Sequence, residues 1–146
     1  SLFNDTSIIY AIRQLSRREY YFSSLIGRRM PVYCSSGGRM MLAHLPKAEV
    51  DDILSRCDMT AITPKTICTP AKVRSKIAEA RDKGYALTVE ETVVGELVVA
   101  GAILNGQGRP IAAVHIAGSL SERTPAQLAK KFGPLAAEAA HAVTRP

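Results

Sequence analysis

The sequence lacks the features that define several large classes of protein. No apolar run reaches the ~20 residues that a membrane-spanning helix needs, so no contact with a membrane is predicted. The first residues do not form a signal peptide. Neither of the common glycine-rich nucleotide-binding motifs is present, and Ser36-Gly37-Gly38 resembles a phosphate loop only faintly.

Residues that bind metals are also few and badly spaced. The three cysteines, Cys34, Cys57 and Cys68, form no Cys-x-x-Cys pair, which argues against a zinc ribbon. They fit free thiols in a reducing compartment better than disulfides. The three histidines, at positions 44, 115 and 141, lack the spacing of metal ligands. We therefore predict a cytoplasmic protein with no metal and no cofactor.

The residues that are present indicate one globular domain. The 146 residues are 47% hydrophobic and 22% charged, with a net charge of +6. Five arginines lie between Arg13 and Arg29, beside the rings of Tyr20–Phe22. This cluster is either a nucleic-acid patch or a solvated sheet edge, and we favour the edge. The chain begins at Ser1 rather than at Met, which suggests a piece of a longer protein.

The stretch from Gly84 to Gly118 is the longest apolar, β-rich passage. It predicts three strands, at Tyr85–Glu91, Glu96–Leu104 and Ile111–Ala117. Asn105-Gly106 lies between the last two, and Asn-Gly between apolar runs is a strong hairpin signal. We therefore expect neighbouring antiparallel strands on which the rest of the chain packs.

One face of the predicted hairpin carries unusually small side chains. Because side chains alternate along a strand, seven residues should share this face. They are Val98, Ala100, Ala102, Ile111, Ala113, His115 and Ala117. The space that they leave is filled either by a closely packed helix or by a ligand. From the strands alone we favour the helix, although a small apolar pocket with one imidazole suits a ligand site.

The segments before this stretch predict two strands and a short helix. Ser7–Gln14 is rich in β-branched residues, and Tyr20–Ile26 is the second strand candidate. Met30–Tyr33 is extended. A helix over Arg39–His44 follows, with Ser35 or Ser36 as its N-cap.

Three further helices are indicated by apolar spacing and capping residues. The first covers Lys47–Cys57. The second starts at Thr69-Pro70 and ends at Gly84. The third starts at Thr124-Pro125, and Gly133-Pro134 should kink or split it. Its expected inner face consists of Leu128, Phe132, Leu135, Ala139 and Val143.

A small enzyme is the alternative reading. Cys34 precedes a predicted helix start, which lowers the pKa of a thiol, and His115 would be its base if the two meet. Glu90-Glu91 is a weak candidate for a catalytic pair, because adjacent strand residues point to opposite faces.

Several motifs, in order, resemble the effector domain of IclR-type transcriptional regulators. Ser36–Ala43 resembles the passage Ser-x-x-Gly-Lys/Arg-x-x-Leu-Ala of that family. The other matching segments are Gly27–Pro31, Arg81–Ala86, Glu90-Glu91 with Gly95, and Pro110–Val114 with Gly118. Each motif is weak alone, but their shared order and spacing, from about residue 7 to 143, are specific.

The resemblance implies that residues 1–146 form a single effector-binding domain. Its fold would be α+β and GAF/PAS-like, with a long antiparallel sheet flanked by helices. The winged helix-turn-helix domain that binds DNA in the family would precede it and is absent from this chain. The resemblance further implies a small organic acid as effector, assembly as a homodimer or tetramer, and no enzymatic activity.

The resemblance also implies a set of ligand-binding residues. Ser36 and Gly37 would hold a carboxylate, and Phe22 would cap the pocket. The remaining pocket positions are Thr88, Val98, His115 and Ala117. Thr88, Val98 and Ala117 depart from the family's commonest polar choices, so they bear on which ligand binds.

Overall fold

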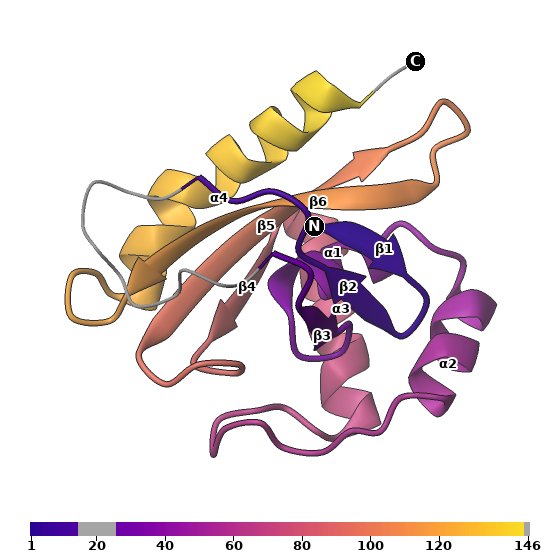
Figure 1. The fold of residues 1–146 in the computed structure, drawn as a ribbon, viewed down its shortest axis with the longest axis horizontal. Coiled ribbons are helices and arrows are strands. Elements are labelled where there is room, and N and C mark those ends of the chain that lie inside the picture. The colour runs from indigo at the N-terminus through magenta and orange to yellow at the C-terminus, as the bar shows by residue number, and fades with distance from the viewer. Residues whose placement is uncertain (15–25, 145–146) are drawn as a thin grey trace.

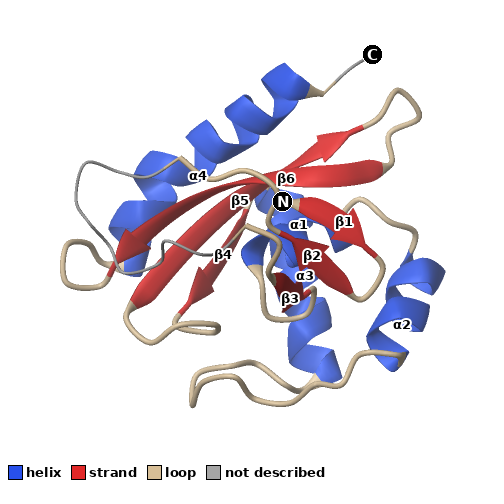
Figure 2. Cartoon of the chain, in the orientation of Figure 1, coloured by secondary structure: helices blue, strands red, loops and turns tan. Residues whose placement is uncertain are grey.

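The structure, a computed structural model, describes residues 1–14 and 26–144. In them, six strands form one antiparallel sheet with the order β3-β2-β1-β6-β5-β4, and four helices flank it (Figures 1 and 2). The strands are β1 (Leu2–Asn4), β2 (Ser7–Ile9), β3 (Arg29–Pro31), β4 (Ala86–Val89), β5 (Glu96–Leu104) and β6 (Pro110–Ser119). The predicted long antiparallel sheet is confirmed.

The N-terminal strands differ from the prediction. β2 ends at Ile9 rather than at Gln14, although Tyr10 continues the pairing through hydrogen bonds with Arg28 and Gly27. β1 was not predicted; it pairs with β2 across a tight turn in which Asp5 has a φ of 57°. The predicted strand at Tyr20–Ile26 and the capping residue Phe22 lie outside the described residues, except for Ile26, which is in a turn.

The three helices with predicted caps begin directly after Ser35, Thr69 and Thr124, and the fourth begins at Lys47 as its apolar spacing predicted. They are α1 (Ser36–Leu42), α2 (Lys47–Ser55), α3 (Pro70–Lys83) and α4 (Pro125–Val143). Ser35 caps α1 by accepting a hydrogen bond from the Gly38 N–H, and Thr124 forms a capping box with Gln127. Gly84 ends α3 in the left-handed conformation that glycine adopts easily. No helix in the described residues is long and apolar enough to cross a membrane.

The helices form a layer on each face of the sheet. α4 lies on one face, over β5 and β6, whereas α1 and α3 lie on the other (Figure 1). The main apolar core lies on the α1 side. A smaller core joins Leu97 and Val99 of β5 to Leu128 and Ala136 of α4.

The predicted inner face of α4 is wrong in its second half. Leu135 is 47% exposed and Val143 is 56% exposed, and Ala139 is also exposed. Instead, Gly133, Ala136 and Ala140 face the sheet. The helix is also continuous rather than split, because Pro134 lies on its exposed side, where water can bond the freed carbonyl.

Close packing between α4 and its neighbours explains why these small residues face inward. A Cβ atom at Gly101 of β5 would lie 2.4 Å from the backbone oxygen of Ala136. A Cβ atom at Gly133 would meet the ring of Tyr85 at 2.6 Å. The helix backbone therefore rests almost directly on the sheet, and only small residues fit between the two.

Candidate functional site

Strand register brings the predicted site residues of the sheet together. Thr88 of β4, Val98 of β5 and Ala117 of β6 are direct neighbours and form one row across three strands. The next row contains Ala100 and His115. Both rows lie on the α1 side of the sheet, because their β5 members alternate with Val99 and Gly101, which face α4.

The start of α1 lies over the second row. The Ser36 hydroxyl oxygen is 3.5 Å from Nδ1 of His115. A Cβ atom at Gly37 would lie 2.3 Å from Cε1 of His115, so only glycine permits this approach. Ser36 and Gly37 are both buried. Six of the seven predicted ligand-binding residues therefore lie around one part of the sheet, and Phe22 lies outside the described residues.

The imidazole of His115 is enclosed by polar and aromatic groups. Its Nε2 is 2.7 Å from the Ser1 hydroxyl, and its ring centroid lies 5.5 Å from that of Tyr10. Burial, with a smaller contribution from the N-terminal ammonium group, lowers the pKa of His115 to about 3. The ring is therefore neutral at physiological pH, with one nitrogen as donor and the other as acceptor.

Sequence reasoning missed two residues near this site, Tyr10 and Glu96. Burial raises the pKa of the Glu96 carboxyl, and burial together with the Glu96 charge raises the pKa of Tyr10 to about 12. Glu96 shares the strand parity of Val98 and Ala100, and that parity was the signal that could have placed it on the site face. Tyr10 had no comparable signal, because its position depends on where β2 ends.

Cys34 has the surroundings of a core thiol. It is fully buried, and its sulfur lies 3.9 Å from the Pro31 carbonyl oxygen. Burial raises the pKa of the thiol to about 12, so it stays protonated at neutral pH. The described partners of His115 are Ser1, Tyr10 and Ser36, not Cys34. This environment does not activate a nucleophile.

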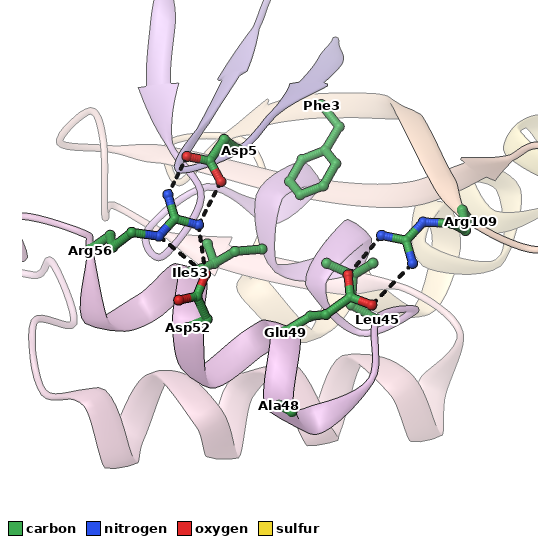
Figure 3. A pocket seen from close by; sticks show the side chains of 9 residues that line it. All are labelled: Phe3, Asp5, Leu45, Ala48, Glu49, Asp52, Ile53, Arg56 and Arg109. Carbon is green, nitrogen blue, oxygen red and sulfur yellow. Dashed lines mark hydrogen bonds and ion pairs between the residues drawn. The ribbon is translucent and has the colours of Figure 1, made fainter.

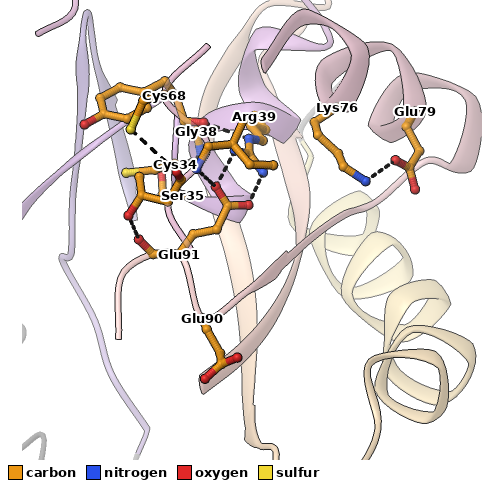
Figure 4. Close-up of polar contacts among 12 residues, drawn as sticks. Cys34, Ser35, Gly38, Arg39, Cys68, Lys76, Glu79, Glu90 and Glu91 are labelled. Carbon is orange, nitrogen blue, oxygen red and sulfur yellow. Dashed lines mark hydrogen bonds and ion pairs between the residues drawn. The ribbon is translucent and has the colours of Figure 1, made fainter. Parts of the chain in front are cut away.

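A buried ion pair behind α1 was not predicted. Arg39 of α1 donates two hydrogen bonds of 2.6 Å to the carboxylate of Glu91, and its Nε bonds the Tyr33 carbonyl oxygen (Figure 4). The Ile67 N–H also donates to Glu91. These contacts fix α1 to the loop after α2 and to the end of β4. Glu90 points elsewhere and accepts a bond from the Gly95 N–H, so Glu90 and Glu91 do not converge.

A separate groove of about 430 Å³ lies between α2, the β1–β2 turn and the β5–β6 hairpin (Figure 3). Its charged residues pair with one another: Arg56 pairs with Asp5 and Asp52, and Arg109 pairs with Glu49. The apolar lining consists of Phe3, Leu45, Ala48 and Ile53. None of the predicted site residues lines this groove. No cluster suited to a metal ion occurs in the described part of the chain.

Comparison with known proteins identifies the family. The family described as "Bacterial transcriptional regulator IclR C-terminal" matches residues 1–145. The chain belongs to the IclR family. It is the effector-binding domain of such a regulator, as the motifs predicted, and the family consists of transcriptional regulators rather than enzymes.

Relatives of this IclR-family domain are known by sequence and by structure. The HTH-type transcriptional regulator XynR of Escherichia coli (strain K12) is 36% identical over 106 residues, which cover 73% of this chain and 42% of XynR. A transcriptional regulator from Rhodococcus sp. RHA1 superposes with a TM-score of 0.87 at 27% identity, covering 95% of this chain and 56% of that one. This chain thus spans about half the length of such relatives.

A further structure of similar fold contains a ligand. It is a double mutant of the inducer-binding domain of the transcription factor PobR from Acinetobacter, in complex with 3-hydroxybenzoic acid. The TM-score is 0.81 at 23% identity, over 99% of this chain and 85% of that chain. This likeness, together with the Rhodococcus structure, confirms the predicted effector-domain fold.

Proposed function

We propose that this domain senses a small organic acid on the α1 face of its sheet and reports it to a DNA-binding domain. The observation that carries the proposal is the meeting of α1 with two rows of small and polar side chains, Thr88–Val98–Ala117 and Ala100–His115. The winged helix-turn-helix domain that would bind DNA lies outside this chain. An effector that binds one arrangement of the domain better would shift the population of the regulator.

The dimensions of the two rows favour a compact ligand. Neighbouring strands lie roughly 4.8 Å apart, so a row across three strands spans about 10 Å. Successive residues on one face lie roughly 6.7 Å apart along a strand. A single ring or a short branched chain with one carboxylate fits these dimensions. Ala117 is exposed, whereas Val98 and Thr88 are buried, so the ligand would enter over β6.

Polar groups at the start of α1 suit a carboxylate. The first N–H groups of a helix have no partner within the helix, and the Ser35 hydroxyl accepts only from Gly38. The N–H groups of Ser36 and Gly37 would therefore receive the carboxylate oxygens. The neutral His115 would donate or accept one hydrogen bond with a hydroxyl or a carboxylate oxygen of the ligand, in place of the 3.5 Å contact between its Nδ1 and the Ser36 hydroxyl. The complex of the PobR domain with 3-hydroxybenzoic acid supports this ligand class.

A thermal-shift screen tests the proposal. The probes are 3-hydroxybenzoate, benzoate, pyruvate and acetate, with benzamide as the uncharged control. A ligand at a hundredfold excess over its Kd adds about 2.7 kcal/mol, or roughly 8 °C in Tm for a domain of this size. We expect at least one ring-bearing carboxylate to raise Tm in this way, and benzamide not to.

Two variants locate the binding. Ala117→Leu should abolish the shift in Tm, because the larger side chain would fill the space that the ligand needs at the β6 end of the row Thr88–Val98–Ala117. Ala71→Leu, at an exposed position on α3, should keep it. If no carboxylate binds, or if a verified ligand binds Ala117→Leu as well as wild type, the proposed site is wrong.

A further inference from the structure

Glu96 is an acidic residue on the same face of the sheet as the proposed effector site. It is the first residue of β5, and its neighbours Leu97 and Val99 pack in the smaller core with α4. Side chains alternate along a strand, so Glu96, Val98 and Ala100 all face the α1 side. The carboxyl of Glu96 therefore lies in line with residues of the proposed site, at the end of β5 that is remote from Ala100.

This carboxyl is partly buried and has few hydrogen-bond partners. In the described part of the chain it accepts one hydrogen bond, from the Thr92 hydroxyl at a long distance of 3.4 Å. The hydroxyl of Ser119, directly across on β6, is hydrogen-bonded within its own turn. Burial raises the pKa of Glu96, and the Thr92 bond and the charges of Arg13 and Arg28 oppose this rise only in part. A carboxylate accepts hydrogen bonds at both oxygens, so Glu96 retains unused acceptor capacity.

Glu96 and His115 stand at opposite ends of the site. Burial, and after it the negative charge of Glu96, raise the pKa of Tyr10 to about 12, and the Tyr10 ring lies 5.5 Å from the ring of His115. Along β5, Glu96 lies roughly 13 Å from Ala100, the cross-strand neighbour of His115, and Val98 is midway. The site thus has a polar group at each end and an apolar middle.

The two ends differ in charge. The end beside His115 is the one that the proposed function assigns to the ligand carboxylate, whereas the other end presents a carboxyl of the protein. We propose that Glu96 determines the specificity of the effector site: it selects a monocarboxylate with a hydroxyl or amino group at its far end and rejects a dicarboxylate. This inference rests on the effector site proposed above and adds the chemistry of the second end of the ligand.

Hydrogen bonding and charge both contribute to this selection. The far hydroxyl or amino group of the ligand would donate to the oxygen of Glu96 that has no partner among the described residues. A second carboxylate on the ligand would face a like charge in a partly buried site, which is costly. An apolar group of the same size would leave the carboxyl without a donor and gain nothing from it.

Matched benzoates measure the selection. Isothermal titration calorimetry at about pH 7.5 compares 3- and 4-hydroxybenzoate, the two methylbenzoates with the same substitution, and the dicarboxylates isophthalate and terephthalate. All share the ring and the first carboxylate, and they differ only in the second substituent. We expect at least one hydroxybenzoate to bind about 10- to 100-fold more tightly than its methyl counterpart. Each dicarboxylate should bind at least about tenfold more weakly than that methylbenzoate.

Two variants of Glu96 separate selection from support of the fold. Glu96→Gln keeps the size and removes the charge, so it should bind the dicarboxylates at least about tenfold more tightly than wild type does. A gain of this kind cannot come from a damaged fold. Glu96→Leu removes the acceptor and should bind the hydroxy- and methylbenzoates alike. The control is Glu138→Gln, which makes the same change in charge at an exposed position on α4 and should keep the wild-type ranking.

The outcomes distinguish this inference from the proposed function. If the methylbenzoates bind wild type and neither hydroxyl improves binding, Glu96 does not select the effector, and the effector site itself stands. The same conclusion follows if the dicarboxylates bind Glu96→Gln no better than wild type. If no benzoate binds, the inference is overturned, and the thermal-shift results for pyruvate and acetate decide whether the effector site is wrong as well.

Discussion

The two faces of the central hairpin are built in different ways from the same strands. On the α4 face, the backbone of Gly101 lies against the backbone of Ala136, and a Cβ atom at Gly118 would lie 2.7 Å from the side chain of Leu128. On the α1 face, polar side chains meet: His115 contacts Ser36, and Arg39 pairs with Glu91 behind them. The first face is held by close apolar packing alone, whereas the second combines the main apolar core with a buried ion pair and hydrogen bonds.

This difference separates the support of the domain from its proposed sensing surface. Close apolar packing fixes α4, and it leaves no polar group for a ligand on that side. A buried ion pair is a poor source of stability, because hydrophobic residues of the same volume are often at least as stable. We infer that Arg39 and Glu91 hold the start of α1 in place over the sheet. The two faces should therefore respond differently to mutation.

Removal of the buried charge should give the largest effect. Glu91→Gln leaves Arg39, which is 1% exposed, without a countercharge, and should lower the free energy of unfolding by about 3–5 kcal/mol. Urea denaturation measures the loss. The control is Glu79→Gln, which breaks exposed pairs with Lys76 and Lys83 and should cost about 1 kcal/mol or less. Equal losses for both variants would mean that Glu91 is not held as described.

Substitutions that add volume should have the second-largest effect on stability, and they should differ between the two faces. Gly101→Ala places a methyl group against the Ala136 carbonyl and should destabilise the domain by about 1–3 kcal/mol. Ala117→Leu, on an exposed part of the other face, should stay within about 0.5 kcal/mol of wild type. The same denaturation measurement compares them. A larger loss for Ala117→Leu would reverse the assignment of the packed face and the open face.

Acid should lower the free energy of unfolding gradually, through the protonation of His115 on the α1 face. The pKa of His115 is lowered to about 3 in the folded state, from an ordinary value near 6.5, so the unfolded chain takes up the proton first. Stability from the neutral ring is complete above pH 6.5 and is lost as pH falls toward 3. Relative to His115→Gln, wild type should lose up to about 1.4 kcal/mol per pH unit below pH 6. Parallel stability curves for the two proteins between pH 6 and 4 would show that the ring is not buried in neutral form.

The sequence predicted the parts of the fold that depend on neighbouring residues. β5 has the predicted bounds, because Asn105-Gly106 fixes the hairpin, and α3 runs from Pro70 to the residue before Gly84. The alternation along β6 also placed Ala113, His115 and Ala117 on one face. These signals are local, and no distant contact overrides them.

The sequence patterns could not predict contacts between residues that are far apart in the chain. Arg39 and Glu91 are 52 residues apart, and neither position has a local pattern that names the other. Periodicity in α4 predicted an inner face that is wrong in its second half, because the close approach of Gly101, which lies on a different element, admits only small residues there. In the same way, the partners of His115 depend on where Ser1 and Tyr10 come to lie.

A methyl NMR titration tests the central claim most directly. The domain is labelled at alanine methyl groups and titrated with the carboxylate that gives the largest thermal shift. We predict that Ala100, Ala113 and Ala117, on the α1 face, change their chemical shifts at a common saturating concentration, while Ala136 and Ala140, on the buried side of α4, do not. Shift changes centred on Ala136 and Ala140, or none at Ala117, would contradict the assignment of the α1 face as the effector site.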